Sequence, residues 1–130
     1  MSKEIEIVYD KRYKGRRLIV VRHHIPAFLT EDGKVRNYMD WFCGYMEVLP
    51  VDKAYQAIKD GADYITYDFD EEYPGAIYGI TWADHFPLSG VDQFNYYVGF
   101  DTNHYSPDEH KFTKHEVIQA LKKMAKGCQK

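Results

Sequence analysis

The chain has 130 residues, of which 16% are aromatic, and it carries a formal net charge of −3 with a pI near 6.0. This length predicts a single domain over 1–130, with 1–3 and 127–130 as frayed tails, and such a chain needs neither a metal nor a disulfide merely to fold. The small negative charge argues against binding to bulk nucleic acid, which requires a basic surface.

The cysteines and the hydropathy of the chain predict a cytoplasmic protein. Cys43 and Cys128 lie far apart and form no CxxC pair, so no disulfide framework is expected, as is usual in a reducing compartment. No run approaches the roughly 18 apolar residues of a membrane span, and the first residues do not resemble a signal peptide. We therefore expect no contact with membranes.

The first half of the chain predicts three strands. Alternating or continuous apolar residues place these strands at 4–9, 17–23 and 41–49. A turn is expected over 10–15, Pro26 is expected to end the second strand, and a loop is expected over 30–37. Pro50 is expected to end the third strand.

The helices are predicted from their capping residues. Asp52 has the side chain of an N-cap and Gly61 suits a C-terminal stop, which predicts a short central helix between them. Thr113 and Glu116 form a capping box before a helix that Gly127 ends. The apolar residues of this helix recur at helical spacing and are expected to pack on the sheet: Val117, Ile118, Leu121 and Met124.

Two further strands are predicted over 76–82 and 95–100, whereas 64–74 is ambiguous between strand and loop. Because strands do not alternate regularly with helices, a doubly wound parallel sheet is not expected. The order predicts an α+β domain with a largely antiparallel sheet, packed by the C-terminal helix and the short central helix.

Charge is unevenly distributed along the chain. Every charged residue in 60–72 is acidic, and aromatic residues lie among these acids. This segment is either an ordinary solvated loop or a surface for a basic protein. The N-terminal part is basic, and its arginines suit either phosphate binding or a solvated hairpin. Arg17 and Arg22 are expected on opposite faces of an ideal strand.

Two aromatic runs carry the polar residues that suggest a site. Each run ends in an acid near a histidine, as Asp84-His85 in the first and as Asp101-Thr102-Asn103-His104 in the second. If the runs pair as neighbouring strands, these ends are expected at one edge of the sheet, beside flat apolar side chains. Such a combination is typical of a small-molecule site.

Asp101 and His104 allow two interpretations. The carboxylate can orient the imidazole and raise its basicity in a ligand-binding or catalytic pair. Alternatively, Asp101 binds backbone N–H groups in an Asx turn that His104 caps. The acids and histidines show no HxH, HxxxH or HExxH spacing, so no metal is predicted, and no motif predicts a cofactor.

These elements, in this order, resemble a family of small uncharacterised proteins of bacteriophages and prophages. The resemblance rests on Trp-Phe-Cys-Gly-Tyr-Met at 41–46, Gly-Ile-Thr-Trp at 79–82 and Gly-Phe-Asp-Thr-Asn-His at 99–104, followed by Asp108 and a closing helix. It implies a phage accessory protein that acts in the bacterial host cytoplasm, and it implies no particular activity. The sequence departs from the family at 102–103, where Thr-Asn replaces a frequent Cys-Ala.

The function we expect from these patterns is a counter-defence protein that binds and sequesters a small host molecule, with a nucleotide signal such as a cyclic nucleotide as the main candidate. Aromatic rings would stack on a base, and an arginine would meet a phosphate, in a homo-oligomer. The expected ligand-binding residues are Trp82, Thr81, Asp84, His85, Tyr97, Asp101, Asn103, His104, Trp41, Tyr45 and Arg17.

Two alternatives remain open. One is an inhibitor that contacts a host defence protein directly through the acidic aromatic segment 60–72. The other is a small hydrolase in which His104 is the general base and Asp101 orients it. An enzyme is the less expected outcome, because no nucleophile motif is present.

Overall fold

A computed structural model describes residues 4–29, 35–103 and 111–127. Its strands are β1 (Ile5–Tyr13), β2 (Arg16–Leu29), β3 (Val35–Val48), β4 (Trp82–His85) and β5 (Tyr96–Asp101). They form one sheet in the order β1-β2-β3-β5-β4, and every neighbouring pair is antiparallel. The predicted α+β class is confirmed.

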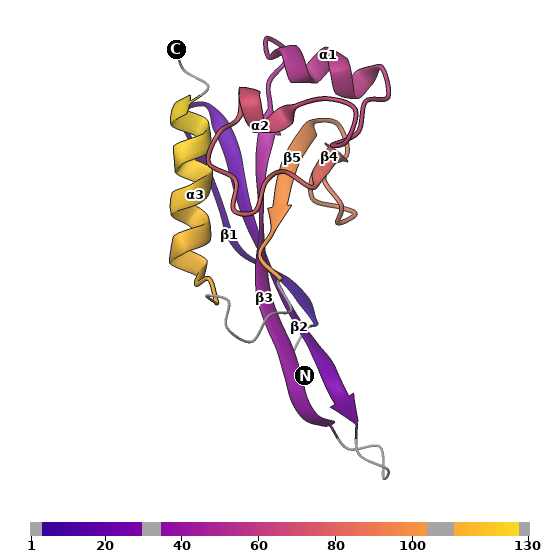
Figure 1. The fold of residues 1–130 in the computed structure, drawn as a ribbon, viewed down its shortest axis with the longest axis vertical. Coiled ribbons are helices and arrows are strands. Elements are labelled where there is room, and N and C mark those ends of the chain that lie inside the picture. Colours follow the sequence, from indigo (N-terminus) through magenta and orange to yellow (C-terminus); the bar gives the residue numbers. More distant parts are fainter. Residues whose placement is uncertain (1–3, 30–34, 104–110, 128–130) are drawn as a thin grey trace.

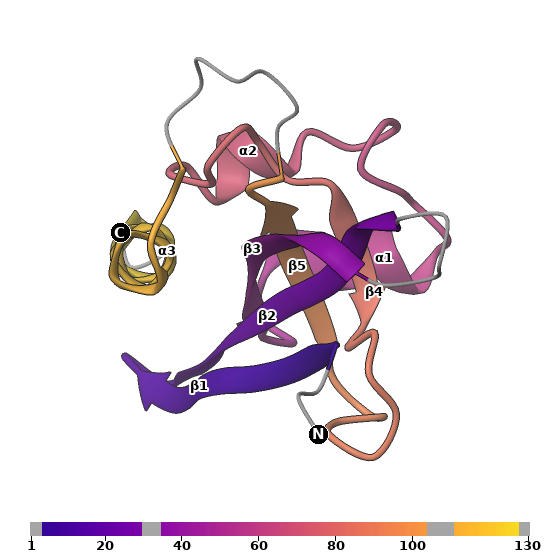
Figure 2. The same cartoon turned by 90° about the horizontal axis from the view of Figure 1, so that it is seen from below.

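One helix packs along a face of this sheet, and the other two lie toward one end of the sheet and contribute to the same core (Figures 1 and 2). The helices are α1 (Lys53–Lys59), α2 (Phe69–Glu72) and α3 (Lys114–Gly127), of which α3 packs along the face. Val117, Leu121 and Met124 of α3 are fully buried in the main core, as the helical spacing predicted. None of the helices in the described ranges is long and apolar enough to cross a membrane.

The capping box of α3 is also confirmed. The Glu116 N–H donates to the Thr113 hydroxyl oxygen at 3.2 Å, and the Thr113 N–H donates to the Glu116 carboxylate at 3.1 Å. These two bonds satisfy backbone donors that a helix otherwise leaves unpaired at its start.

The opposite face of the sheet carries a smaller apolar cluster. It is covered by the chain between β4 and β5, from which Phe86 packs on Tyr45 and Tyr97. Cys43 is buried in this cluster, and burial raises the pKa of its thiol to about 12. The thiol is therefore a small apolar group of the core and is unreactive there.

Gly44 and Gly99 are positions where a close approach requires glycine. Gly44 faces Phe100 across the β3–β5 pair, and Tyr45 faces Gly99. A Cβ on Gly44 would lie 2.7 Å from the Phe100 ring, and one on Gly99 would lie 2.5 Å from the Tyr45 ring. Each aromatic ring therefore lies over the glycine of the other strand.

The turn predicted over 10–15 is wrong in its extent. β1 continues to Tyr13, and the turn is confined to Lys14 and Gly15, which both adopt the left-handed conformation, with φ of 51° and 81°. This two-residue turn matches the twist of the flanking strands, so the pairing needs no longer loop.

Pro26 does not end β2, which continues to Leu29. β1 pairs with β2 only as far as His23, so Pro26 lies where β2 has a described strand on one side alone, and there a missing N–H is tolerated. β3 likewise begins at Val35, inside the predicted loop.

The strand predicted over 76–82 is wrong for all but its last residue. Tyr78 and Gly79 have φ of 61° and 87°, which an extended strand does not allow, and β4 begins only at Trp82. The ambiguous segment 64–74 contains α2. The short central helix predicted after Asp52 is present as α1.

Candidate functional site

The two polar strand ends lie at opposite ends of the β4–β5 pair, so the expectation that they share one edge is wrong. Asp84 faces Tyr97 near the start of β5, whereas Asp101 ends β5. At about 3.3 Å per residue, the positions of Tyr97 and Asp101 are about 13 Å apart along the strand. β4 and β5 are antiparallel, so the C-terminal ends of the two strands lie at opposite ends of the pair. The Asp84 and Asp101 motifs, each at the end of its own strand, are therefore far apart.

Around Asp101 the structure shows the Asx turn. The Asn103 N–H donates to the Asp101 carboxylate at 2.7 Å, and the buried Thr102 hydroxyl donates to the Phe42 carbonyl at 2.7 Å. His104, the expected partner of Asp101, lies outside the described residues. The catalytic pair therefore stays a prediction.

Around Asp84 the contacts are also local. The carboxylate of Asp84 accepts the His85 N–H at 2.7 Å, and the Trp82 indole donates to the His85 carbonyl at 3.0 Å. The His85 ring stacks on Tyr96, which belongs to the helix-covered face. Thr81 pairs through its backbone N–H with Gly99 and has an exposed side chain.

Most of the expected residues share the other sheet face, but, of those in the described ranges, several are buried or already paired. The strand register places the following on that face: Arg17, Trp41, Tyr45, Trp82, Asp84, Tyr97 and Asp101. Tyr97 is 0% exposed and Tyr45 is 9% exposed, so neither offers a ring face to a ligand. Trp41 is half-buried and stacks on His23.

Arg17 lies at the surface and is engaged by an acid. Its Nε and Nη2 donate to both oxygens of Asp10, at 2.8 and 2.6 Å. The Arg17 guanidinium holds the pKa of Asp10 below its ordinary value. Arg22 binds Asp40 and Glu6 on the helix-covered face, as the five-residue spacing from Arg17 predicted.

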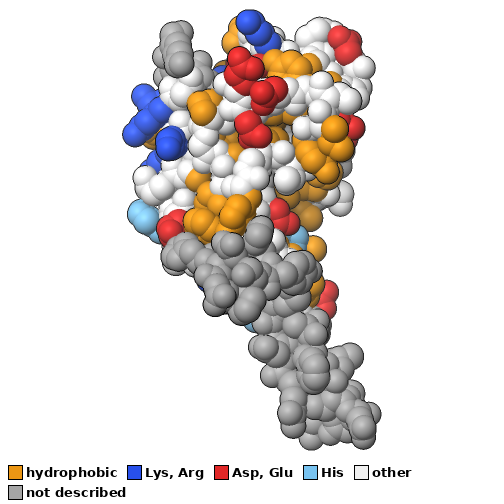
Figure 3. Space-filling view, in the orientation of Figure 1, with side chains coloured by type: hydrophobic (Ala, Val, Ile, Leu, Met, Phe, Trp, Pro, Cys, Tyr) orange, Lys and Arg blue, Asp and Glu red, His pale blue; other side chains and the backbone are white. Residues whose placement is uncertain are grey.

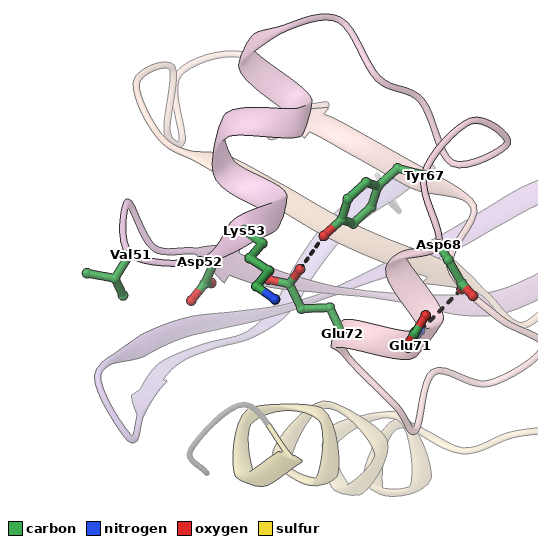
Figure 4. Close-up of a pocket in the computed structure, with 7 residues that line it drawn as sticks. All are labelled: Val51, Asp52, Lys53, Tyr67, Asp68, Glu71 and Glu72. Carbon is green, nitrogen blue, oxygen red and sulfur yellow. Dashed lines mark hydrogen bonds between the residues drawn. The ribbon is translucent and has the colours of Figure 1, made fainter.

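A pocket of about 510 Å³ opens between α1 and α2 (Figure 4). We call it the acidic pocket; it is lined by Val51, Asp52, Lys53, Tyr67, Asp68, Glu71 and Glu72. Four of these residues are acids and one is a base. The segment 60–72 supplies most of them, and sequence reasoning identified its charge but not the pocket.

Asp52 forms a fixed wall of this pocket through contacts that the sequence did not reveal. It occupies the N-cap position of α1 without a cap bond, and its two oxygens bind Nη1 and Nη2 of Arg16 instead. The Tyr73 hydroxyl and the Leu49 N–H also donate to it, at 2.8 and 3.0 Å. Burial opposes the charge of Asp52, but these donors outweigh it and lower the pKa of Asp52.

Glu72 is positioned by two donors from different segments. The Tyr67 hydroxyl donates to Glu72 Oε1 at 2.6 Å, and the Ala54 N–H of α1 donates to Oε2 at 3.2 Å. Burial and this carboxylate raise the pKa of Tyr67 to about 12, so the phenol stays protonated as a donor. Glu72 therefore joins α2 to the start of α1.

Asp68 and Glu71 complete the acidic side of the pocket. The Asp68 carboxylate caps α2 by accepting the Glu71 N–H at 3.2 Å, and both residues are exposed. Figure 3 shows acidic side chains gathered with apolar ones on the face that carries α2. Three apolar side chains nearby in sequence are also exposed: Val51 at 87%, Tyr64 at 49% and Ile65 at 76%.

A second pocket of about 500 Å³ lies beside the β1–β2 hairpin. It is lined by Arg12, Arg17 and 90–95, and the Phe94 ring in it is 88% exposed. Asp92 anchors this loop by accepting the Tyr97 hydroxyl at 2.7 Å. Burial opposes the charge of Asp92, but donors from Asn95 and Tyr97 outweigh it and lower its pKa to about 2.

No protein-family model, curated protein or solved structure matches this chain. Within the ranges that the structure describes, no three side chains of His, Cys, Asp or Glu are grouped to hold a metal ion.

Proposed function

We propose that the protein binds a basic segment of another protein and seats a lysine or arginine side chain in the acidic pocket. The observation that carries this proposal is the lining of the pocket, in which four carboxylates border about 510 Å³ and Lys53 is the one basic residue. Asp52 is already paired with Arg16 behind the pocket, so Asp68, Glu71 and Glu72 supply most of the negative charge that a ligand would meet. A cationic head suits such a site, and complementary charge also speeds the encounter with a basic partner.

The fixed geometry of the carboxylates supports binding. Asp52 and Glu72 each accept at least two hydrogen bonds, including one or more from residues distant in sequence, so their positions do not have to be ordered when a ligand arrives. The exposed Val51 next to the pocket suits the apolar stem of a lysine or arginine.

The resemblance to phage proteins gives this binding a context. A phage accessory protein with an acidic pocket would act as an inhibitor that occupies a basic surface of a host defence protein. Many such surfaces bind nucleic acid, and a cluster of carboxylates competes for the same lysines and arginines.

The test uses a fluorescein-labelled nona-arginine peptide and fluorescence anisotropy. We expect binding that weakens steeply with salt and that the double variant Asp68→Asn/Glu71→Gln weakens by about 5–30-fold, since each lost surface charge contributes up to about 1 kcal/mol. Asparagine keeps the cap of α2, so the fold is preserved.

Asp60→Asn is the matched control, because it removes a charge from the same acidic segment outside the pocket. It should change the affinity far less than the double variant. Equal affinity of the wild type and the double variant would contradict the proposed pocket. An affinity that does not change with salt concentration would contradict the proposed electrostatic recognition.

A second candidate function is the binding of a small anionic molecule with a flat ring, such as a nucleotide. It is favoured by the pocket beside the hairpin, where Arg12 and Arg17 lie near the exposed ring of Phe94 and the amides of Gln93 and Asn95. Arg12 is the more available of the two arginines, because its side chain is 66% exposed whereas the fork of Arg17 already binds Asp10. An arginine fork suits phosphate, and stacking on an aromatic ring contributes about 1–3 kcal/mol per base.

Mass spectrometry of small molecules released from the denatured protein tests this second candidate. We expect a nucleotide that is retained by the wild type and lost in Phe94→Ala. Retention by Phe94→Ala equal to that of the wild type would argue against stacking. The third possibility is a hydrolase with His104 as its general base. His104 lies outside the described residues, so the described contacts do not support this possibility.

A further inference from the structure

β1 forms one margin of the sheet. It runs for nine residues and, among the described strands, pairs with β2 alone. Figure 2 shows it at the edge of the sheet, with α3 over the face and not beyond the edge. A long edge strand presents a row of backbone donors and acceptors that can pair with another strand.

The charges of β1 are divided between its two halves. Glu6 lies near its start, and Lys11 and Arg12 lie near its end, while Glu4 precedes the strand and Lys14 follows it. The one acid of the second half, Asp10, is already paired with Arg17 of β2. A second copy in antiparallel pairing, related by a two-fold axis, would place the acidic half of each strand opposite the basic half of the other. This surface is complementary to itself, as a symmetric dimer requires.

A β-bulge near Val8 determines which side chains share a face. Glu6 pairs with Arg22 and Lys11 pairs with Leu18, so Glu6 and Lys11 lie on one face although they are five residues apart. In a two-fold pair that places Val8 opposite Tyr9, Glu6 therefore faces Lys11 on the same face, and symmetry makes this contact twice.

The side chains concerned are accessible in the single chain. Lys11 is exposed, and its ammonium lies 5.9 Å over the Tyr9 ring. The Glu6 side chain is 38% exposed and lies 3.3 Å from Arg22. A carboxylate has about four lone-pair sites, so Glu6 can bind a second cation and keep its ion pair with Arg22.

We propose that β1 pairs with β1 of a second copy of this chain, with Glu6 facing Lys11, so that the two five-stranded sheets become one continuous sheet. The pairing does not involve the acidic pocket, so the proposed dimer and the proposed function are tested independently of each other. It accounts for an edge strand that is long, unpaired on one side within the described residues and divided in charge.

Sedimentation equilibrium tests the pairing, because the monomer has a mass of 15.3 kDa. We expect a dimer of the wild type that dissociates on dilution. Glu6→Lys and Lys11→Glu should each weaken the dimer by about 5–30-fold, because each change turns two attractive cross-strand pairs into two repulsive ones.

Mixing the two variants tests the register. A Glu6→Lys chain carries two lysines that would face two glutamates of a Lys11→Glu chain, so the equimolar mixture should recover a dimer of nearly wild-type affinity. Lys59→Glu, which reverses an exposed charge on α1 outside both pockets and away from β1, should leave dimerisation unchanged. A mixture that stays monomeric would overturn the register.

A wild-type chain that sediments as a 15.3-kDa species at every concentration would overturn the dimer itself. Circular dichroism shows whether each variant is folded. Because Glu6 also contacts Arg22, the milder pair Glu6→Gln and Lys11→Gln provides the same test if a reversal unfolds the chain. Each should weaken the dimer severalfold, and dimers unaffected by both would contradict the Glu6–Lys11 contact.

Discussion

Arg16 and Arg17 are neighbours in sequence with opposite environments. Successive residues of a strand point to opposite faces, so one arginine enters the interior and the other reaches the surface. Arg16 is 3% exposed and binds Asp52, which lies 36 residues away, whereas Arg17 binds Asp10 across the hairpin. The same chemical group thus forms a buried ion pair and a surface ion pair.

The buried pair predicts a large effect for a small change. Asp52→Asn should lower the free energy of unfolding by about 3–5 kcal/mol, because it leaves the Arg16 charge buried without its counterion. Asp10→Asn is the matched control and should cost about 0.2–1 kcal/mol, since its pair with Arg17 is partly exposed. Chemical denaturation measures both, and equal losses would contradict the distinction.

The pH dependence of the same variant has a definite sign. The pKa of Asp52 is lower in the folded protein than its ordinary value of 3.8, so the stabilisation by this carboxylate is complete above about pH 4 and is lost as the pH falls through the folded pKa. The difference in stability between the wild type and Asp52→Asn should therefore narrow in acid. A difference that stays constant down to pH 2 would contradict the assignment.

At the scale of elements, β3 and β5 are matched through their glycines and aromatic rings. Gly44 faces Phe100, and Tyr45 faces Gly99, so each ring fills the space over a residue without a side chain. The match fixes the register of the two strands, because a shift by one residue would bring glycine against glycine in one direction and ring against ring in the other.

This packing predicts a non-additive pair of substitutions. Gly99→Ala should destabilise the protein by about 1–3 kcal/mol, since its Cβ would lie 2.5 Å from the Tyr45 ring. The cost should be smaller in a Tyr45→Ala background, where the ring is absent, than in a Tyr45→Phe background, where it remains. Equal costs in both backgrounds, measured by denaturation, would show that the contact is not the cause.

The elements also show what the sequence could predict. Local patterns identified the strands at 4–9, 17–23, 41–49 and 95–100 and the capped C-terminal helix, because alternation and capping are properties of neighbouring residues. The same patterns wrongly predicted a strand over 76–82, where Tyr78 and Gly79 have a left-handed backbone conformation. An aromatic residue seldom adopts that conformation, so the sequence did not indicate it.

The candidate site was harder to predict than the fold. Periodicity does not give the direction of strand pairing, so it could not separate Asp84 from Asp101. The acidic pocket depends on contacts between segments far apart, such as Arg16 with Asp52 and Tyr73 with Asp52. The charge of 60–72 was visible in the sequence, but the hollow beside it was not.

At the scale of the whole molecule, β2 and β3 extend well beyond the packed core (Figure 1). β1 pairs with β2 as far as His23, and β5 pairs with β3 only from Cys43 onward. Farther out, within the described ranges, the two long strands pair with each other alone. This part forms a two-stranded ribbon that projects from the sheet.

Removal of the ribbon should leave the core intact. Replacing 26–38 by Asn-Gly joins Ile25 to Met39, which face each other, through a turn that suits antiparallel strands. We expect a cooperative unfolding transition and a change in the free energy of unfolding of less than about 1 kcal/mol, because an isolated two-stranded ribbon is marginally stable. Loss of the cooperative transition in chemical denaturation would contradict this division.

The ribbon also has a consequence for how the native protein opens. Amide hydrogens of β2 near Val20 should exchange with solvent only during global unfolding, because that stretch is buried and has a strand on each side. Amides toward Leu29 need only the local separation of two strands. Protection of the β2 amides from hydrogen exchange should therefore decrease along the strand from Val20 toward Leu29. The two strands of the ribbon can separate while the core stays folded and excludes water.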